Sequence, residues 1–130
     1  MGITKQLIRE YLDELHISSR LDDDGDIVVV QSADEDFGHD VIIYLMINEN
    51  RLSYLAGAPG YEPKHDLYFL ANRHNTRRYT PTAVVRNGSL RMEYSFLLDE
   101  EVSKEYIVEN CIKLMLGTIW RGFVDLEKDE

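Results

Sequence analysis

The segment that follows Ser103 constrains the fold most, because it predicts a helix with an unusually wide apolar surface. Ser103 is suited to cap this helix, and Val102 and Ile107 stand at the two positions of a hydrophobic staple. We expect the helix to run to about Arg121, with the apolar residues Tyr106, Ile107, Val108, Cys111, Ile112, Leu114, Met115, Leu116, Ile119 and Trp120. A stripe about 100° wide is enough to pack a helix on one sheet, and this surface is roughly twice as wide. The helix is therefore expected to bury a second side against another helix or another subunit.

Two shorter helices are predicted earlier in the chain. The first covers residues 4–15, because Thr4 can cap it and apolar residues recur at helical spacing after it. The second covers residues 63–76, because Pro63 suits the first turn of a helix. The apolar face of this second helix consists of Leu67, Leu70, Ala71 and His74.

Six short segments are predicted to form strands, namely Ile17–Leu21, Ile27–Gln31, Val41–Ile47, Leu52–Gly57, Thr82–Val85 and Leu90–Leu98. The pair Asn87-Gly88 lies between the last two and is a strong hairpin signal. Every residue of Val41–Ile47 is apolar, so we expect this strand to be covered on both faces, and hence to be central in the sheet or packed under another element. Strands so closely spaced leave no room for helical crossovers, which favours an antiparallel sheet.

The order of these elements is α-β-β-β-β-α-β-β-α. It predicts one α+β domain over residues 1–130, in which three helices pack on an antiparallel β-sheet.

The segment RLDDDGDIVVV, from Arg20 to Val30, gathers four aspartates around Gly25. If Gly25 is placed at position 6 of an EF-hand loop, Arg20 and Gln31 occupy positions 1 and 12, and neither supplies the carboxylate that calcium requires. Asp24 followed by glycine is a favoured pair for a tight turn. We therefore predict a turn between two strands and no metal site.

The formal net charge is −10, and residues 1–66 carry 14 acidic and 5 basic side chains. Such a field repels a phosphate backbone, so nucleic acid is an unfavourable partner. No run of residues approaches the roughly 20 apolar positions of a membrane span. A single cysteine, Cys111, cannot form an internal disulfide, which is typical of a cytoplasmic protein.

Catalysis has little support in the sequence. The pairs His39-Asp40 and His65-Asp66 could orient an imidazole, but no recognisable nucleophile accompanies them. The H-E-x-x-H and C-x-x-C motifs of metal sites do not occur, so we expect no cofactor. An enzyme assembled from scattered residues stays a further hypothesis, with the candidates His65, Asp66, Asn72 and Tyr79.

The segment RHNTRRY is the one basic cluster of the sequence. Its Arg77 and Arg78 could bind an anion or an acidic segment of a partner, although cations also favour the C-terminal end of a helix by about 0.3–1 kcal/mol each. Trp120 and Phe123 could equally belong to the core or anchor a partner. Cys111 is expected to be a small core residue.

Three stretches carry a family resemblance, namely YLDELHISSRLDDDGDIVV, LANRHNTRRYTPTAVVRNGSLRMEYSFLL and VSKEYIVENCIKLML. On these the chain resembles the YbjN family of bacterial sensory transduction regulators and, more distantly, the type III secretion chaperones of similar fold. Asn72 and Asn75 match asparagines that YbjN proteins carry at the end of the second helix. The resemblance implies a secretion-chaperone-like fold and a protein that works by binding. Such chaperones are small, acidic and dimeric, and they hold an extended client segment along apolar patches.

The leading hypothesis is a non-enzymatic protein-binding or regulatory module that forms a homodimer and holds a partner segment on apolar surface. The residues predicted to contact the partner are Tyr106, Leu114, Trp120, Phe123, Arg77 and Arg78. The alternative is a protein that binds a small ligand or a cation through the acidic segment 22–40.

Overall fold

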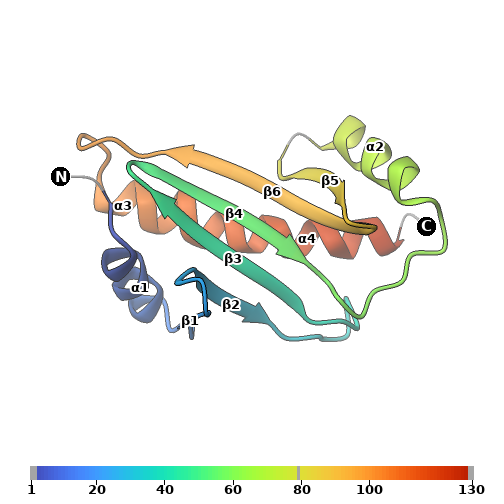
Figure 1. Cartoon of the computed structure of the whole chain (residues 1–130), viewed down its shortest axis with the longest axis horizontal. Helices are drawn as coiled ribbons and strands as arrows, with labels where there is room; N and C mark the ends of the chain where they lie inside the picture. Colours follow the sequence, from blue (N-terminus) through green and yellow to red (C-terminus); the bar gives the residue numbers. More distant parts are fainter. Residues whose placement is uncertain (1–2, 79, 129–130) are drawn as a thin grey trace.

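A six-stranded antiparallel sheet with a long helix across one face forms the body of the molecule, as the computed structural model in Figure 1 shows. The structure describes residues 3–78 and 80–128. The strands are β1 (Arg20–Leu21), β2 (Ile27–Gln31), β3 (Val41–Asn48), β4 (Arg51–Gly57), β5 (Thr82–Arg86) and β6 (Ser89–Leu97), and their order in the sheet is β1-β2-β3-β4-β6-β5.

Two short helices, α1 (Lys5–Glu14) and α2 (Leu67–Arg77), lie near opposite ends of the molecule (Figure 1). The C-terminal helix runs as one rod through α3 (Lys104–Tyr106), a π-helical segment η1 (Ile107–Leu114) and α4 (Met115–Lys128). The element order and the α+β class therefore confirm the prediction from the sequence.

The core lies between the sheet and the C-terminal helix. Alternate residues of the two central strands are buried on that side, namely Val41, Ile43 and Leu45 of β3 and Leu52, Tyr54 and Ala56 of β4. From the helix, Cys111, Ile112, Ile119 and Phe123 are completely buried against them. The alternating apolar residues of the strands form one apolar face, and the stripe on the helix forms another. These two faces pack together to form the core.

The wide apolar surface of the C-terminal helix is mostly covered within the chain. Phe37, from the loop after β2, is fully buried and places its ring 5.6 Å from the ring of Trp120 and 5.8 Å from that of Phe123. At the start of the helix, Lys104 pairs with Glu14 of α1 at 3.0 Å. Only Tyr106 and Leu114, of the apolar residues predicted for this surface, are exposed by more than a third, at 47% and 59%. The expectation of a second subunit therefore no longer follows from the width of this surface.

The opposite face of the sheet is not crossed by a helix in the described part of the chain (Figure 1). The prediction that Val41–Ile47 is covered on both faces is wrong, because Ile42, Tyr44 and Met46 are only partly buried. Leu55 of β4 is likewise partly buried, and Val30 of β2 is 46% exposed. Apolar side chains of the central strands are therefore partly exposed here, whereas Val28 of β2, on the same face beside Tyr44, is buried.

Some predicted boundaries are wrong, and local contacts explain why. Helix α2 begins four residues after Pro63, because the side chain of Asp66 caps it by accepting the N–H groups of Tyr68 and Phe69 at 2.9 and 3.1 Å. Strand β1 is limited to two residues, because the side chain of Arg9 binds the Ser19 carbonyl and hydroxyl, each at 3.2 Å.

The C-terminal helix continues to Lys128 rather than ending near Arg121. Gly117 and Gly122 weaken the helical signal in the sequence, but burial of Phe123, Val124 and Leu126 outweighs the propensity.

The turns and the other caps follow the sequence closely. Asn87 and Gly88 have φ values of 50° and 75° between Arg86 and its partner Ser89, as a tight hairpin requires. Thr4 accepts the N–H of Leu7 at 3.1 Å, and Ser103 accepts that of Tyr106 at 3.1 Å. Both N-caps were predicted.

Tyr54 joins the sheet to the C-terminal helix through a polar contact in the core. Its ring is 1% exposed, and its hydroxyl donates a hydrogen bond to the carbonyl of Cys111 in the π-helical segment. Burial, together with the neighbouring Cys111, raises the pKa of the Tyr54 phenol well above its ordinary value, so the hydroxyl stays a donor.

We predict that Tyr54→Phe lowers the free energy of unfolding by about 1–2 kcal/mol, because it removes a buried hydrogen bond without leaving a large cavity. Urea unfolding would show a lower midpoint with an unchanged slope. Tyr106→Phe, at an exposed position, is the control and should leave the midpoint unchanged. Equal midpoints for Tyr54→Phe and the wild-type protein would contradict the assigned role.

Candidate functional site

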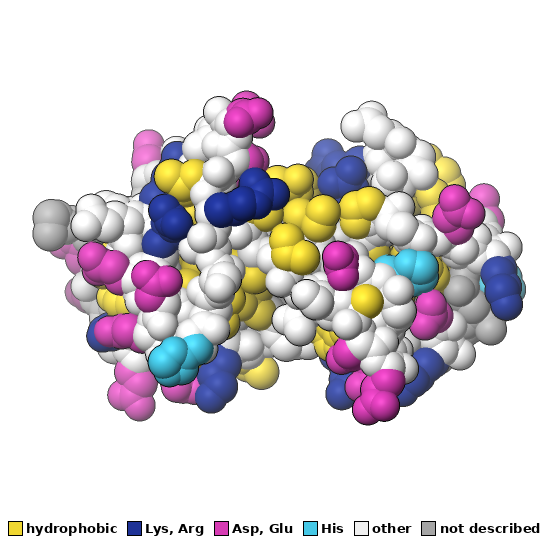
Figure 2. Space-filling view, turned by 90° about the horizontal axis from the view of Figure 1, so that it is seen from below, with side chains coloured by type: hydrophobic (Ala, Val, Ile, Leu, Met, Phe, Trp, Pro, Cys, Tyr) yellow, Lys and Arg dark blue, Asp and Glu magenta, His cyan; other side chains and the backbone are white. Residues whose placement is uncertain are grey.

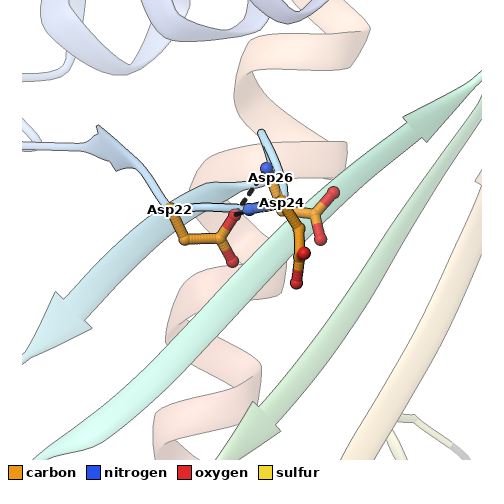
Figure 3. Close-up of side chains that lie close together, drawn as sticks. All are labelled: Asp22, Asp24 and Asp26. Carbon is orange, nitrogen blue, oxygen red and sulfur yellow. Dashed lines mark hydrogen bonds between the residues drawn. The ribbon is translucent and has the colours of Figure 1, made fainter.

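The aspartates of the β1–β2 turn lie close together. Carboxylate oxygens of Asp22, Asp24 and Asp26 all lie within 4.8 Å of one another. However, Figure 3 shows the Asp22 carboxylate directed at the backbone, where its Oδ1 accepts the N–H groups of Asp24 and Asp26 at 3.0 and 2.8 Å. Gly25 has φ = 82°, and its N–H donates to the Asp22 carbonyl at 3.0 Å. The segment is a tight turn stabilised by its first aspartate, as predicted.

We predict that Asp22→Ala lowers the free energy of unfolding by about 1 kcal/mol, because two backbone N–H groups lose their acceptor. Asp23→Ala is the matched control and should have little effect. Thermal unfolding of the two variants measures the difference. A calcium-dependent rise in the wild-type Tm that Asp22→Ala abolishes would instead indicate a cation site.

The two His-Asp pairs are engaged in local structure. The Asp40 carboxylate accepts the N–H of Ala33 at 2.8 Å, and the ring of His39 lies 5.3 Å from that of Phe37. Asp66 is the N-cap of α2, and His65 stacks on Phe69 with the ring centroids 5.8 Å apart.

The residues considered for a scattered active site are not gathered in a deep pocket where they are described. His65, Asp66 and Asn72 are all exposed, and Asp66 is occupied as a helix cap. Tyr79 lies outside the described residues. Cys111 is completely buried, and burial raises the pKa of its thiol to about 11, so the reactive thiolate is disfavoured at neutral pH.

The C-terminal end of α2 is fixed to the edge strand β5 by two side chains. His74 is 5% exposed, and its Nε2–H donates to the Pro81 carbonyl at 2.7 Å. Asn75 accepts the N–H of Ala83 at 2.7 Å and donates to its carbonyl at 2.8 Å. Asn75 therefore satisfies the edge of the sheet as a neighbouring strand would. Asn72, the other family-matching asparagine, is exposed on α2.

Burial lowers the pKa of His74 from its ordinary value. The hydrogen bond to Pro81 acts against this shift, the Arg78 cation adds to it, and Asp125 opposes it more weakly. Below about pH 6.5 the unfolded chain therefore binds a proton at His74 more readily than the folded chain does.

We predict that the folded protein loses stability as the pH falls from about 7.5 to about 5.5, in part because of His74. His74→Gln retains a hydrogen-bond donor without a titrating group, so its free energy of unfolding should change less over this interval. Urea unfolding of both proteins at the two pH values measures this. An identical pH dependence in the two proteins would show that His74 does not contribute.

A groove of about 900 Å³, here called the α2–α4 groove, separates the end of α2 from the outward side of the C-terminal helix. Arg77 and Arg78 line it from the α2 side, and Arg78 also pairs with Asp125 of α4 at 2.5 Å. The helix contributes Lys113, Leu114, Gly117 and Arg121. The structure thus brings three of the predicted partner-contact residues together, namely Arg77, Arg78 and Leu114.

The other predicted contact residues lie elsewhere. Tyr106 is exposed at the first turn of the C-terminal helix, and Trp120 is partly buried against Phe37. Phe123 is completely buried and has no surface to offer a partner in this conformation. Sequence reasoning overlooked Lys113 and Arg121 as groove residues, although their spacing of four from Gly117 places all three along one line of the helix.

The second candidate surface is the apolar outer side of the sheet, here called the open face, formed by Val30, Ile42, Tyr44, Met46 and Leu55. Cross-strand pairing places Val30 beside Ile42 and Tyr44 beside Leu55, so these side chains form short apolar rows. The rows end at Gly57 and Glu93, and Met46 pairs with Ser53. Figure 2 looks along the sheet from its β1–β2 edge with the open face uppermost, and hydrophobic side chains line a depression between two projections. The open face is therefore a candidate interaction surface.

Comparison with known proteins yields a family. The family model named YbjN, described as "Putative bacterial sensory transduction regulator", matches residues 4–111. No curated protein matches the chain. Among the described residues, no helix is both long enough and apolar enough to span a membrane.

Proposed function

Because the chain belongs to the YbjN family, described as bacterial sensory transduction regulators, we propose that it is a non-enzymatic regulatory module that holds a partner protein. The partner contributes an extended segment, which lies on the open face in the manner of a client on a secretion chaperone. The single observation that carries this proposal is that the central strands present apolar side chains on a face that none of the described helices crosses.

An antiparallel sheet with one face in water normally carries polar residues on that face. Here Ile42, Tyr44 and Met46 alternate along β3 on the outer side, next to Leu55 of β4. Covering apolar surface is favourable by about 25 cal/mol per Å², so a partner that shields these side chains gains binding energy from each of them. A partner segment that covers the outer face of β3 would account for the apolar composition of this strand.

An extended segment suits the shape of this face better than a second sheet does. Two packed sheets approach to about 10 Å over their whole area, which the projections beside the depression in Figure 2 oppose. A single extended segment fits within the depression and places every second side chain on the apolar rows. At the β5–β6 side, Arg86 and Glu93 form an exposed ion pair at 2.5 Å that borders the face with both charges.

The non-enzymatic part of the proposal rests on how the chemically capable residues are used. Asp22, Asp40 and Asp66 accept backbone N–H groups, His74 donates to a backbone carbonyl, and Cys111 is a buried thiol. A lone thiol also suits the reducing cytoplasm, where we place the protein.

Binding of designed peptides tests the proposal. We expect the wild-type chain to bind peptides that alternate apolar and polar residues, and to bind scrambled peptides of the same composition at least about tenfold more weakly. Met46→Lys should weaken binding by at least about tenfold, corresponding to about 1.4 kcal/mol, because it places a charge among the apolar rows. Thr82→Lys adds the same charge at an exposed edge position of the same face and is the control.

Light scattering of the same proteins reports the homodimer predicted from the sequence. A dimer that persists in Met46→Lys leaves the open face available and is compatible with the proposal. A dimer that Met46→Lys dissociates assigns the open face to a second copy of the chain, and equal peptide binding by Met46→Lys and Thr82→Lys also contradicts the proposal.

A further inference from the structure

We infer that the α2–α4 groove binds an acidic peptide segment in which two carboxylate residues flank an apolar residue, in the order acid-x-apolar-x-acid. This site lies on the helix side of the molecule and does not depend on the open face, which is on the other side of the sheet. The proposal rests on the charge, the spacing and the open floor of the groove.

The groove concentrates positive charge on an acidic protein. Arg77, Arg78, Lys113 and Arg121 line it, against Glu109 in its described lining and Asp125, which pairs with Arg78 beside it, whereas the whole chain carries a formal net charge of −10. A local field of opposite sign to the rest of the surface attracts an acidic segment to this position and away from others. Arginine clusters are also a recurrent means of binding acidic motifs.

The ion pairs of Lys113 and Arg78 do not block such a ligand. Lys113 lies 3.8 Å from Glu109, and both side chains are more than half exposed, so this pair contributes little and can be exchanged for another carboxylate. Arg78 pairs with Asp125 at 2.5 Å, which links the α2 end of the groove to α4. The guanidinium groups at positions 78 and 121 can donate further hydrogen bonds, because each carries five N–H donors.

The spacing of the cations defines the spacing of the ligand. Lys113, Gly117 and Arg121 follow one another at intervals of four along the outward line of the helix. The rise of a helix places Lys113 and Arg121 about 12 Å apart. In an extended peptide, residues i and i+4 point to the same side and lie about 13 Å apart, with residue i+2 between them on that side. A peptide with acids at i and i+4 therefore aligns its central residue with Gly117.

The floor of the groove at Gly117 is open. A Cβ atom added to Gly117 would meet no atom within 4 Å apart from those of its chain neighbours and its own helix backbone, and the nearby Leu114 is 59% exposed. The bare helix backbone beside an apolar side chain forms a slot for the central residue of the peptide. This apolar slot favours a peptide over a simple anion, and the acidic remainder of the surface opposes a long polyanion such as nucleic acid.

Fluorescence anisotropy of the full-length chain with a labelled peptide tests the inference. The probe contains Glu-Ser-Leu-Ser-Glu in a neutral context, and the control peptide contains Ser-Glu-Leu-Glu-Ser, with the same composition and charge. We expect the probe to bind at least about tenfold more tightly than the control peptide, and to bind more weakly as salt is added.

Two variants separate binding from folding. Gly117→Gln fills the slot, and it should weaken binding at least about tenfold while raising Tm, because glutamine has a higher helix propensity than glycine. Arg121→Glu should weaken binding by a similar factor. Arg51→Glu makes the same change in charge on the exposed end of β4 and should alter the affinity by less than about twofold. Met46→Lys should also leave this affinity unchanged, which distinguishes the groove from the open face.

Three results would overturn the inference. The probe and the control peptide could bind equally, Gly117→Gln could retain the wild-type affinity, or equimolar inorganic phosphate could displace the probe. The first would show that charge alone is recognised, the second would place the peptide elsewhere, and the third would indicate a general anion site.

Discussion

The hydrogen bond from the Tyr54 hydroxyl to the Cys111 carbonyl fixes how the C-terminal helix is rotated against the sheet. With Cys111 turned inward, Ile119 and Phe123 also face the core, while Lys113, Gly117 and Arg121 face outward. The contact lies in the π-helical segment, where the hydrogen-bonding pattern differs from that of the regular helix that follows. A buried hydroxyl needs a partner, so this polar contact selects one register of an otherwise apolar interface. The outward line that forms the floor of the groove is a consequence of that register.

The same arrangement leaves the molecule with two dissimilar surfaces. One helix layer covers one face of the sheet, and the apolar outer residues of β3 and β4 are only partly buried on the other. The end of α2 is fixed by His74 and Asn75, and this positions Arg77 and Arg78 opposite the helix. An apolar face and a basic groove on opposite sides suit a regulator that joins one partner segment to another. Burial of apolar surface would supply affinity at the open face, and charge complementarity would supply selectivity at the α2–α4 groove.

Local patterns explain what could be predicted from the sequence. The Asn87-Gly88 hairpin, the Ser103 cap and the aspartate turn depend on neighbouring residues alone, and the element order follows from them. Whether the outer face of the sheet is covered cannot be predicted in this way. The apolar sequence of β3 is the same whether a helix, a partner or solvent lies above it. The apolar surface of the C-terminal helix likewise appeared too wide for one chain to cover. Part of its cover is Phe37, which packs against Trp120 and comes from a loop whose sequence is otherwise polar and acidic. The groove joins residues more than thirty positions apart, and only the spacing of Lys113, Gly117 and Arg121 could have indicated it.

The residues that the family model matches include the open face but only part of the α2–α4 groove. Residues 4–111 include every strand, so the whole open face lies within the region that the family model describes. The match ends at Cys111, before the three helix residues that form the floor of the groove. The open face could therefore carry a property that the whole family shares, whereas the proposed acidic-peptide site depends on a part of the helix that the family model does not reach. The groove has to be tested on this chain itself, and its Arg77 and Arg78 wall acquires a role only in combination with that later part of the helix.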